Sequence, residues 1–156
     1  MRVVHTCLII GLSLGSFYVR ADPTDNASAQ AFFENYVGLS DAYDDKVADL
    51  YADSAVIRTF RRYPHGLERS MELTGSQWKA LLVRAMPIAR AQADRSTYSN
   101  VEVSVSGDKA TIKADRYAMR KCYTDTGYYM VVERQANGEY LIVEEYSETQ
   151  PQSNCQ

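Results

Sequence analysis

Apolar residues recur at a helical spacing in the first half of the chain. Between residues 27 and 40 they return every three or four positions, as on one face of a helix that Asp25 or Asn26 would cap. A shorter helix is expected at 44–51. The apolar and β-branched run that follows predicts a strand at 55–62.

The segment 63–72 is expected to be a loop or an irregular hairpin, because it contains Pro64 and Gly66. A helix then follows from residue 74 to about residue 93. Its start carries the pattern of a capping box, in which the Thr74 hydroxyl and the Gln77 side chain each bond the other residue's backbone N–H.

From residue 97 onward the apolar period changes to two, which is typical of strands. Turn residues divide this half into strands at about 97–106, 110–123, 128–135 and 139–147. Consecutive strands need no helical crossovers. The sequence therefore predicts an α+β fold with N-terminal helices packed on a curved antiparallel sheet.

The N-terminus has the pattern of a secretory signal peptide. Arg2 precedes an uncharged stretch that ends near Tyr18, and Val19 and Ala21 are small residues suited to signal peptidase. Cleavage near Ala21 would make the protein periplasmic or secreted. The expected division is a signal peptide at 1–21, a flexible lead at 22–26, one domain at 27–149 and a tail at 150–156.

Charge and composition exclude several kinds of partner. Loss of Arg2 and Arg20 would take the net charge from −3 to about −5, which argues against nucleic acid as a ligand. No stretch of the mature chain is apolar enough to span a membrane. A single mature histidine, His65, gives no basis for a zinc site, and no cofactor is expected.

Two cysteines remain after the predicted cleavage, Cys122 and Cys155. In an exported chain they are expected to form a disulfide that ties the C-terminal tail to the sheet. Two free thiols are the alternative.

The passage Asp45-Lys46-Val47-Ala48-Asp49-Leu50-Tyr51-Ala52-Asp53-Ser54-Ala55-Val56-Ile57 resembles a short-helix-to-strand segment of the NTF2-like superfamily. The order of elements is similar to its SnoaL-like and ketosteroid-isomerase-like branches. The resemblance implies a cystatin-like cone whose curved sheet wraps the first helix and leaves a pocket at its open end. It supplies no catalytic set that matches residue by residue.

The strand at 110–123 leaves the position of Arg116 open. Unbroken alternation would place Arg116 on the face of Ala110, Ile112 and Ala114, where it could bind an anion. The alternative is a β-bulge near Asp115 and Arg116.

The residues chosen as pocket candidates are aromatic or cationic: Tyr36, Tyr43, Arg58, Trp78, Arg116, Tyr117 and Tyr129. The aromatic members equally suit a hydrophobic core. Asp41 and His65 are candidate acid–base groups, with a helix end and an exposed loop as their alternatives. Arg58, Arg61 and Arg62 form a basic cluster for which Glu144 and Glu145 are expected counter-charges.

These observations favour a non-catalytic exported domain that binds a small apolar or amphipathic molecule or a protein partner. One alternative is a cofactor-independent enzyme of the isomerase or cyclase kind, with an acid–base residue in the cone. The other is an interaction module of a cell-envelope assembly or of the immunity type. A homodimer is left open.

Overall fold

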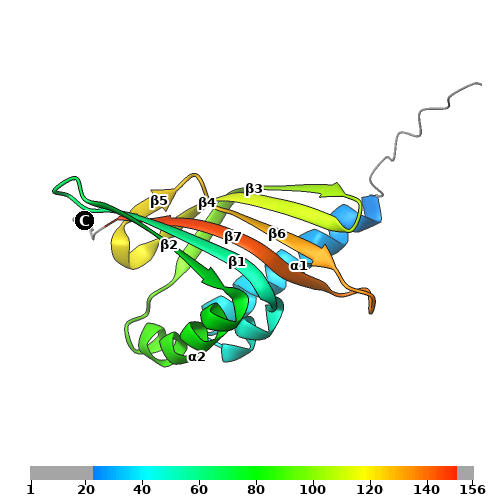
Figure 1. Ribbon diagram of the computed structural model, residues 1–156, viewed down its shortest axis with the longest axis horizontal. Helices are drawn as coiled ribbons and strands as arrows, with labels where there is room; N and C mark the ends of the chain where they lie inside the picture. Colours follow the sequence, from blue (N-terminus) through cyan, green and yellow to red (C-terminus); the bar gives the residue numbers. More distant parts are fainter. Residues whose placement is uncertain (1–22, 151–156) are drawn as a thin grey trace, which may run out of the picture.

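The computed structural model describes residues 23–150 of the chain. Helices and strands alternate in the first half, and strands dominate the second (Figure 1). The helical elements are α1 (Pro23–Asp41), the 3₁₀ helix η1 (Asp45–Leu50), α2 (Gly75–Ala91) and the 3₁₀ turn η2 (Met119–Lys121). The strands are β1 (Tyr51–Arg62), β2 (Glu68–Thr74), β3 (Ser96–Ser106), β4 (Lys109–Ala118), β5 (Tyr123–Asp125), β6 (Tyr129–Arg134) and β7 (Tyr140–Thr149).

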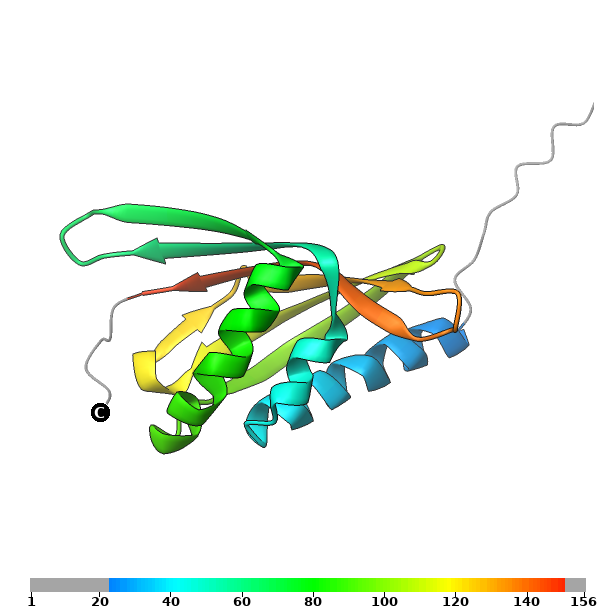
Figure 2. The ribbon, with the colours of Figure 1, turned by 60° about the horizontal axis from the view of Figure 1, so that its bottom comes forward.

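One curved, open sheet contains all the described strands, in the order β2-β1-β7-β6-β4-β3, with β5 paired to β4. Figure 2 shows α1 and α2 on the same side of this sheet, which is its concave face. The predicted α+β cone is therefore confirmed. The sheet is mixed and not wholly antiparallel, because β1 pairs with β7 in parallel. These two strands come from distant parts of the chain, so no tight turn has to join them.

The core lies between α1 and the middle of the sheet. Phe33 of α1 is buried against strand residues whose side chains are almost completely inaccessible to solvent. These strand residues are Ile57, Ala110, Ile112, Met130, Val132 and Ile142.

Helix α2 starts as the sequence predicts. The Thr74 hydroxyl accepts the Gln77 N–H at 3.3 Å, and the Gln77 side chain accepts the Thr74 N–H at 2.9 Å. Gly75 follows the cap, and a Cβ atom there would lie 1.8 Å from the carbonyl oxygen of Ala52. The start of α2 therefore lies so close to β1 that only glycine fits at residue 75.

Several predicted boundaries are wrong, among them the start of the strand expected at 55–62, since β1 begins at Tyr51. Helix α1 begins at Pro23, so residues 23–26 are helical, and Asp25 and Asn26 lie within the helix where a cap was expected. Residues 68–72 belong to strand β2, where a loop was expected. The strand lies at the edge of the sheet, and its apolar residues, Met71 and Leu73, come only near its end. The strand expected at 110–123 ends at Ala118 and is followed by η2 and β5.

Several predictions fall outside the described residues. They are the signal peptide at 1–21, the tail from residue 151, and the bond between Cys122 and Cys155, since Cys155 belongs to that tail. Within residues 23–150, none of the helices combines the length and the apolar character needed to cross a bilayer.

Candidate functional site

A cavity of about 310 Å³ opens on the concave side of the sheet, where α1 ends. Helix α1, the middle of α2, and residues of β3, β4 and β7 surround it. Its lining combines tyrosine rings and apolar side chains with several charged groups. The lining residues are Tyr36, Ser40, Asp41, Tyr43, Leu82, Met86, Ala89, Asp94, Arg95, Ser96, Tyr98, Arg116, Ala118, Lys121 and Thr149.

Arg116 reaches this cavity because β4 alternates without interruption. Ala110, Ile112 and Ala114 are buried, and Arg116 continues the same face two residues later. The predicted bulge near Asp115 and Arg116 is absent from β4. The irregularity lies in the partner strand β3, between Ser99 and Glu102. The concave placement of Arg116 is the correct alternative.

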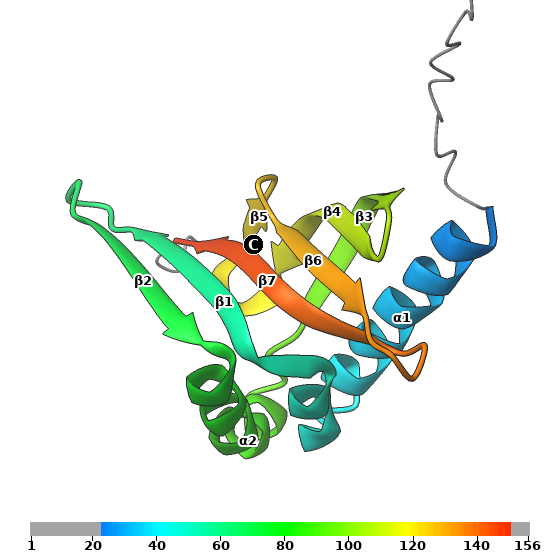
Figure 3. The same cartoon turned by 45° about the vertical axis from the view of Figure 1, so that its right-hand side comes forward.

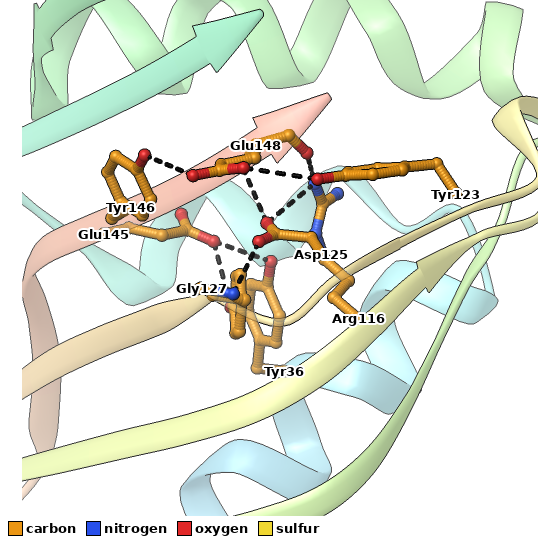
Figure 4. A network of polar contacts seen from close by, with 9 residues as sticks. Tyr36, Arg116, Tyr123, Asp125, Gly127, Glu145, Tyr146 and Glu148 are labelled. Carbon is orange, nitrogen blue, oxygen red and sulfur yellow. Dashed lines mark hydrogen bonds and ion pairs between the residues drawn. The ribbon is translucent and has the colours of Figure 1, made fainter. Parts of the chain in front are cut away.

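The Arg116 guanidinium is fixed from several sides (Figure 4). Its Nη2 donates to the backbone oxygen of Glu148 at 2.7 Å and lies 3.5 Å from Asp125 Oδ2. Its Cζ lies 5.7 Å from the centre of the Tyr128 ring. Burial by itself would lower the Arg116 pKa, but the oxygens of Tyr98 and its other neighbours raise the pKa above the ordinary value. Arg116 therefore stays cationic.

One atom of this guanidinium has no partner. Arg116 Nε is buried, and no acceptor within the described residues bonds it. A buried N–H without a partner is unfavourable by about 1–3 kcal/mol. Arg116 lines the cavity, so a ligand there could offer its guanidinium an acceptor that the described residues do not.

Asp125 is fully buried and structural. Its Oδ1 accepts the Gly127 N–H at 2.9 Å, and its Oδ2 accepts the Glu148 N–H at 2.6 Å. These bonds tie the turn after β5 to the end of β7 (Figure 4). Asp125 thereby holds the backbone of Glu148 where Arg116 can bond it.

Glu145 lies deeper, at the centre of a cluster of tyrosines. Its carboxyl accepts hydrogen bonds from Tyr36 at 3.3 Å, Tyr51 at 2.5 Å and Tyr128 at 3.0 Å. Only 4% of Glu145 is exposed. Ile142 and Glu145 are both buried although they are three positions apart, where simple alternation would give two or four. A register shift in the pairing of β6 with β7 lies between them and explains this.

Burial raises the pKa of Glu145 above its ordinary value of 4.5, although the tyrosine hydroxyls and Arg116 act in the opposite direction. The same burial, together with the nearby carboxyl, raises the pKa of Tyr36, Tyr51 and Tyr128 well above 10.0. The cluster therefore holds its protons tightly.

Two further predicted residues lie at the cavity. Tyr43 is buried, and its hydroxyl accepts a hydrogen bond from Arg95 Nε at 2.9 Å. Asp41, the last residue of α1, also lines the cavity. The structure therefore brings Tyr36, Tyr43, Arg116 and Asp41 together.

The other pocket candidates do not line this cavity. Arg58 and Tyr129 lie on the convex face, where both bond Glu144. Tyr117 also faces that side, since it alternates with the inward Arg116 and Ala118, and it is 37% exposed.

Trp78 packs against the core, and His65 is exposed in the loop between β1 and β2. The pocket candidates chosen from the sequence therefore do not all line one cavity. Glu144 does pair with Arg58 as expected, whereas Glu145 pairs with none of the basic cluster.

Glu145, Tyr98 and Tyr128 are not among the residues that the sequence indicated for the site. A signal for the first was present, because adjacent residues of a strand point to opposite faces. Glu144 and Glu145 could not both face solvent. No group of three His, Cys, Asp or Glu side chains within residues 23–150 has an arrangement that would hold a metal ion.

Comparison with known proteins identifies the fold. No family model matches the sequence, and no curated protein matches it. An NTF2-like protein of unknown function from Pseudomonas putida KT2440 superposes with a TM-score of 0.57 at 14% identity, over 81% of this chain and 87% of that one. A proposed dehydratase of the NTF2-like family from Streptomyces avermitilis gives 0.56 at 15% identity, over 81% and 96%.

A proposed ketosteroid isomerase from Parabacteroides distasonis ATCC 8503 gives a TM-score of 0.53 at 13% identity, over 78% of this chain and 84% of that one. At these identities the likeness shows the fold alone. The chain has the NTF2-like, cystatin-like fold, which confirms the resemblance seen in the sequence.

Proposed function

We propose that the chain is an exported, non-catalytic binding domain whose cavity takes a small amphipathic molecule with an acidic group. The observation that carries this proposal is Arg116, a cationic side chain that lines the cavity and whose guanidinium keeps an N–H donor without an acceptor among the described residues. Guanidinium groups bind planar carboxylates through paired N–H donors. An acceptor on the ligand would satisfy N–H donors of the guanidinium for which the described residues provide no acceptor.

The rest of the lining suits an aromatic or aliphatic body. Tyr36 and Tyr98 present ring surface near Arg116, and Leu82 and Met86 of α2 provide apolar contact. The volume of about 310 Å³ is at the lower end of the range for small-molecule sites. Arg95 Nε already donates to the Tyr43 hydroxyl at 2.9 Å, whereas Arg116 Nε has no acceptor among the described residues, so Arg116 is the better candidate for the ligand's acidic group.

The experiment measures binding of 2-naphthoate by isothermal titration calorimetry, with 2-naphthalenemethanol as the ligand that lacks the acid. The wild-type protein should prefer the acid. Arg116→Gln should weaken binding of the acid by roughly tenfold or more, because a charge-assisted hydrogen bond contributes about 1.5–3 kcal/mol.

Arg58→Gln is the matched control, because Arg58 lies on the opposite face of the sheet, and it should leave binding unchanged. Equal binding of acid and alcohol, or an unchanged affinity in Arg116→Gln, would contradict the proposal. Absence of any binding would contradict it too.

A second candidate, an acid–base enzyme, rests on Glu145 and its raised pKa. Glu145 does not line the cavity, so a proton would have to pass through Tyr36, which lines the cavity and whose hydroxyl bonds the carboxyl. Deuterium exchange at the carbon next to the carbonyl of 2-tetralone, followed by NMR, tests this function. Exchange that Glu145→Gln abolishes would favour the enzyme over the binding domain.

A further inference from the structure

The hairpin formed by β1 and β2 projects past the rest of the sheet (Figures 1 and 3). On its convex face each arginine has an acidic partner. Arg58 lies 3.0 Å from Glu72 and 2.7 Å from Glu144, and Arg62 lies 3.0 Å from Glu68. The charges of this face are therefore neutralised within the protein.

The concave face of the same hairpin differs. Arg61 shares the face of the buried Ile57, and Arg69 lies directly opposite Arg61 in the register of the two strands. Neither arginine forms an ion pair with a carboxylate of residues 23–150. Like charges directly opposite each other on neighbouring strands are destabilising. The fold therefore retains an arrangement that its own stability does not favour.

Tyr63 is the contact that the two arginines share. The guanidinium carbons of Arg61 and Arg69 lie 4.8 Å and 6.0 Å from the centre of its ring. The ring stabilises their charge only weakly, since a cation–π contact at an exposed site contributes little. Arg61 Nε is buried and has no hydrogen-bond partner among the described residues. At least one donor here is without an acceptor.

Apolar side chains flank these groups. Met71 follows Arg69 on the same face and is 49% exposed, and Leu67 at the end of the hairpin loop is 42% exposed. Arginine, tyrosine and methionine are enriched at protein–protein interfaces. This mixture of charged and apolar side chains suits a peptide better than a lone anion. Glu68 and Glu72 on the other face make the hairpin a poor site for nucleic acid, because their charge would repel phosphates.

We propose that this hairpin patch, defined as Arg61, Tyr63, Leu67, Arg69 and Met71, binds an acidic segment of a protein partner. Carboxylates of the segment would bond the two guanidinium groups, and its apolar side chains would cover Leu67 and Met71. The proposal does not depend on a ligand in the cavity, because none of the five residues lines it.

The test measures fluorescence anisotropy of a labelled peptide of alternating Glu and Leu, with a second peptide that carries Gln in place of Glu. The full chain should bind the Glu peptide, and more weakly as salt is added. The double variant Arg61→Gln with Arg69→Gln should lose about tenfold or more in affinity. The double variant Arg58→Gln with Arg62→Gln, on the convex face of the same hairpin, should lose no more than about twofold.

Circular dichroism and thermal unfolding establish that both double variants are folded. Equal binding of the Glu and Gln peptides, equal losses in the two double variants, or no binding to the wild-type chain would each overturn the proposal. Thermal unfolding in the presence of inorganic phosphate tests whether the patch binds small anions instead. If phosphate raises the melting temperature through Arg61 and Arg69 while the Glu peptide does not bind, the patch is a small-anion site and the proposed protein partner is wrong.

Discussion

The two faces of the sheet differ in the partners that they give to charged side chains, and the neighbouring residues Glu144 and Glu145 show this difference most directly. Glu144 lies on the convex face, where it pairs with Arg58 and accepts a bond from Tyr129. Glu145, the next residue of β7, is buried on the concave face, and only tyrosine hydroxyls bond its carboxyl. The convex face balances its charges within the protein. The concave face keeps polar groups whose requirements are only partly met, and such groups are where binding and chemistry are expected.

The largest test of this difference removes each carboxyl in turn. Glu145→Ala should lower the free energy of unfolding by about 3 kcal/mol or more, because it leaves three buried tyrosine hydroxyls without their acceptor. Glu144→Ala should change it far less, since its partners are solvent-accessible. Urea denaturation measures both. Similar losses in the two variants would show that the faces are energetically alike.

A second test uses pH. Because burial raises the pKa of Glu145, the folded protein binds this proton more tightly than the unfolded chain does. The stability that the proton contributes is fully present below the ordinary pKa of 4.5 and is lost as the pH rises through the raised folded value. The stability of the wild type relative to Glu145→Gln should therefore fall as the pH rises above about 4.5, by about 1.4 kcal/mol for each unit of pKa shift.

Urea denaturation of both proteins across this range provides the measurement. Glu144→Gln, compared with wild type in the same way, should show a much smaller dependence. A relative stability that rises with pH would mean that the tyrosine hydroxyls outweigh burial and keep Glu145 ionised.

The smallest expected effect concerns the hairpin. Arg69→Glu places an acid opposite Arg61 on the concave face, so it should raise the free energy of unfolding by about 0.2–1 kcal/mol. On the convex face, Glu68→Arg breaks the existing pair with Arg62 and should lower it slightly. Thermal unfolding at low salt separates the two outcomes. A loss of stability in Arg69→Glu would show that the arginines already have a partner.

Much of the fold was predictable from local patterns. The capping box at Thr74 and Gln77 marks the start of α2 correctly, and the period-two segments identify the strands of the second half. These signals depend on neighbouring residues only. Strand β2 gives only a weak signal, because this edge strand is polar except for Met71 and Leu73 near its end.

The candidate site was less predictable. Tyr36, Tyr43 and Arg116, three of the pocket candidates, line the cavity. Arg58 and Tyr129 were placed there wrongly, since aromatic and cationic residues suit both faces of a curved sheet. The adjacent pair Glu144 and Glu145 indicates that one of the two points inward, but which one does so depends on a register shift between β6 and β7 that local sequence does not encode.

The parallel pairing of β1 with β7 has a consequence for the order of folding. Strand β1 belongs to the first half of the chain, but it pairs with β7, the last strand. The sheet is therefore complete only after these two distant segments have paired. Contacts so distant in sequence slow folding, because the chain loses loop entropy before it gains their energy. We expect β3, β4, β6 and β7 to assemble first as a meander. The β1–β2 hairpin then joins late, and its outer edge is the last part of the sheet to become ordered.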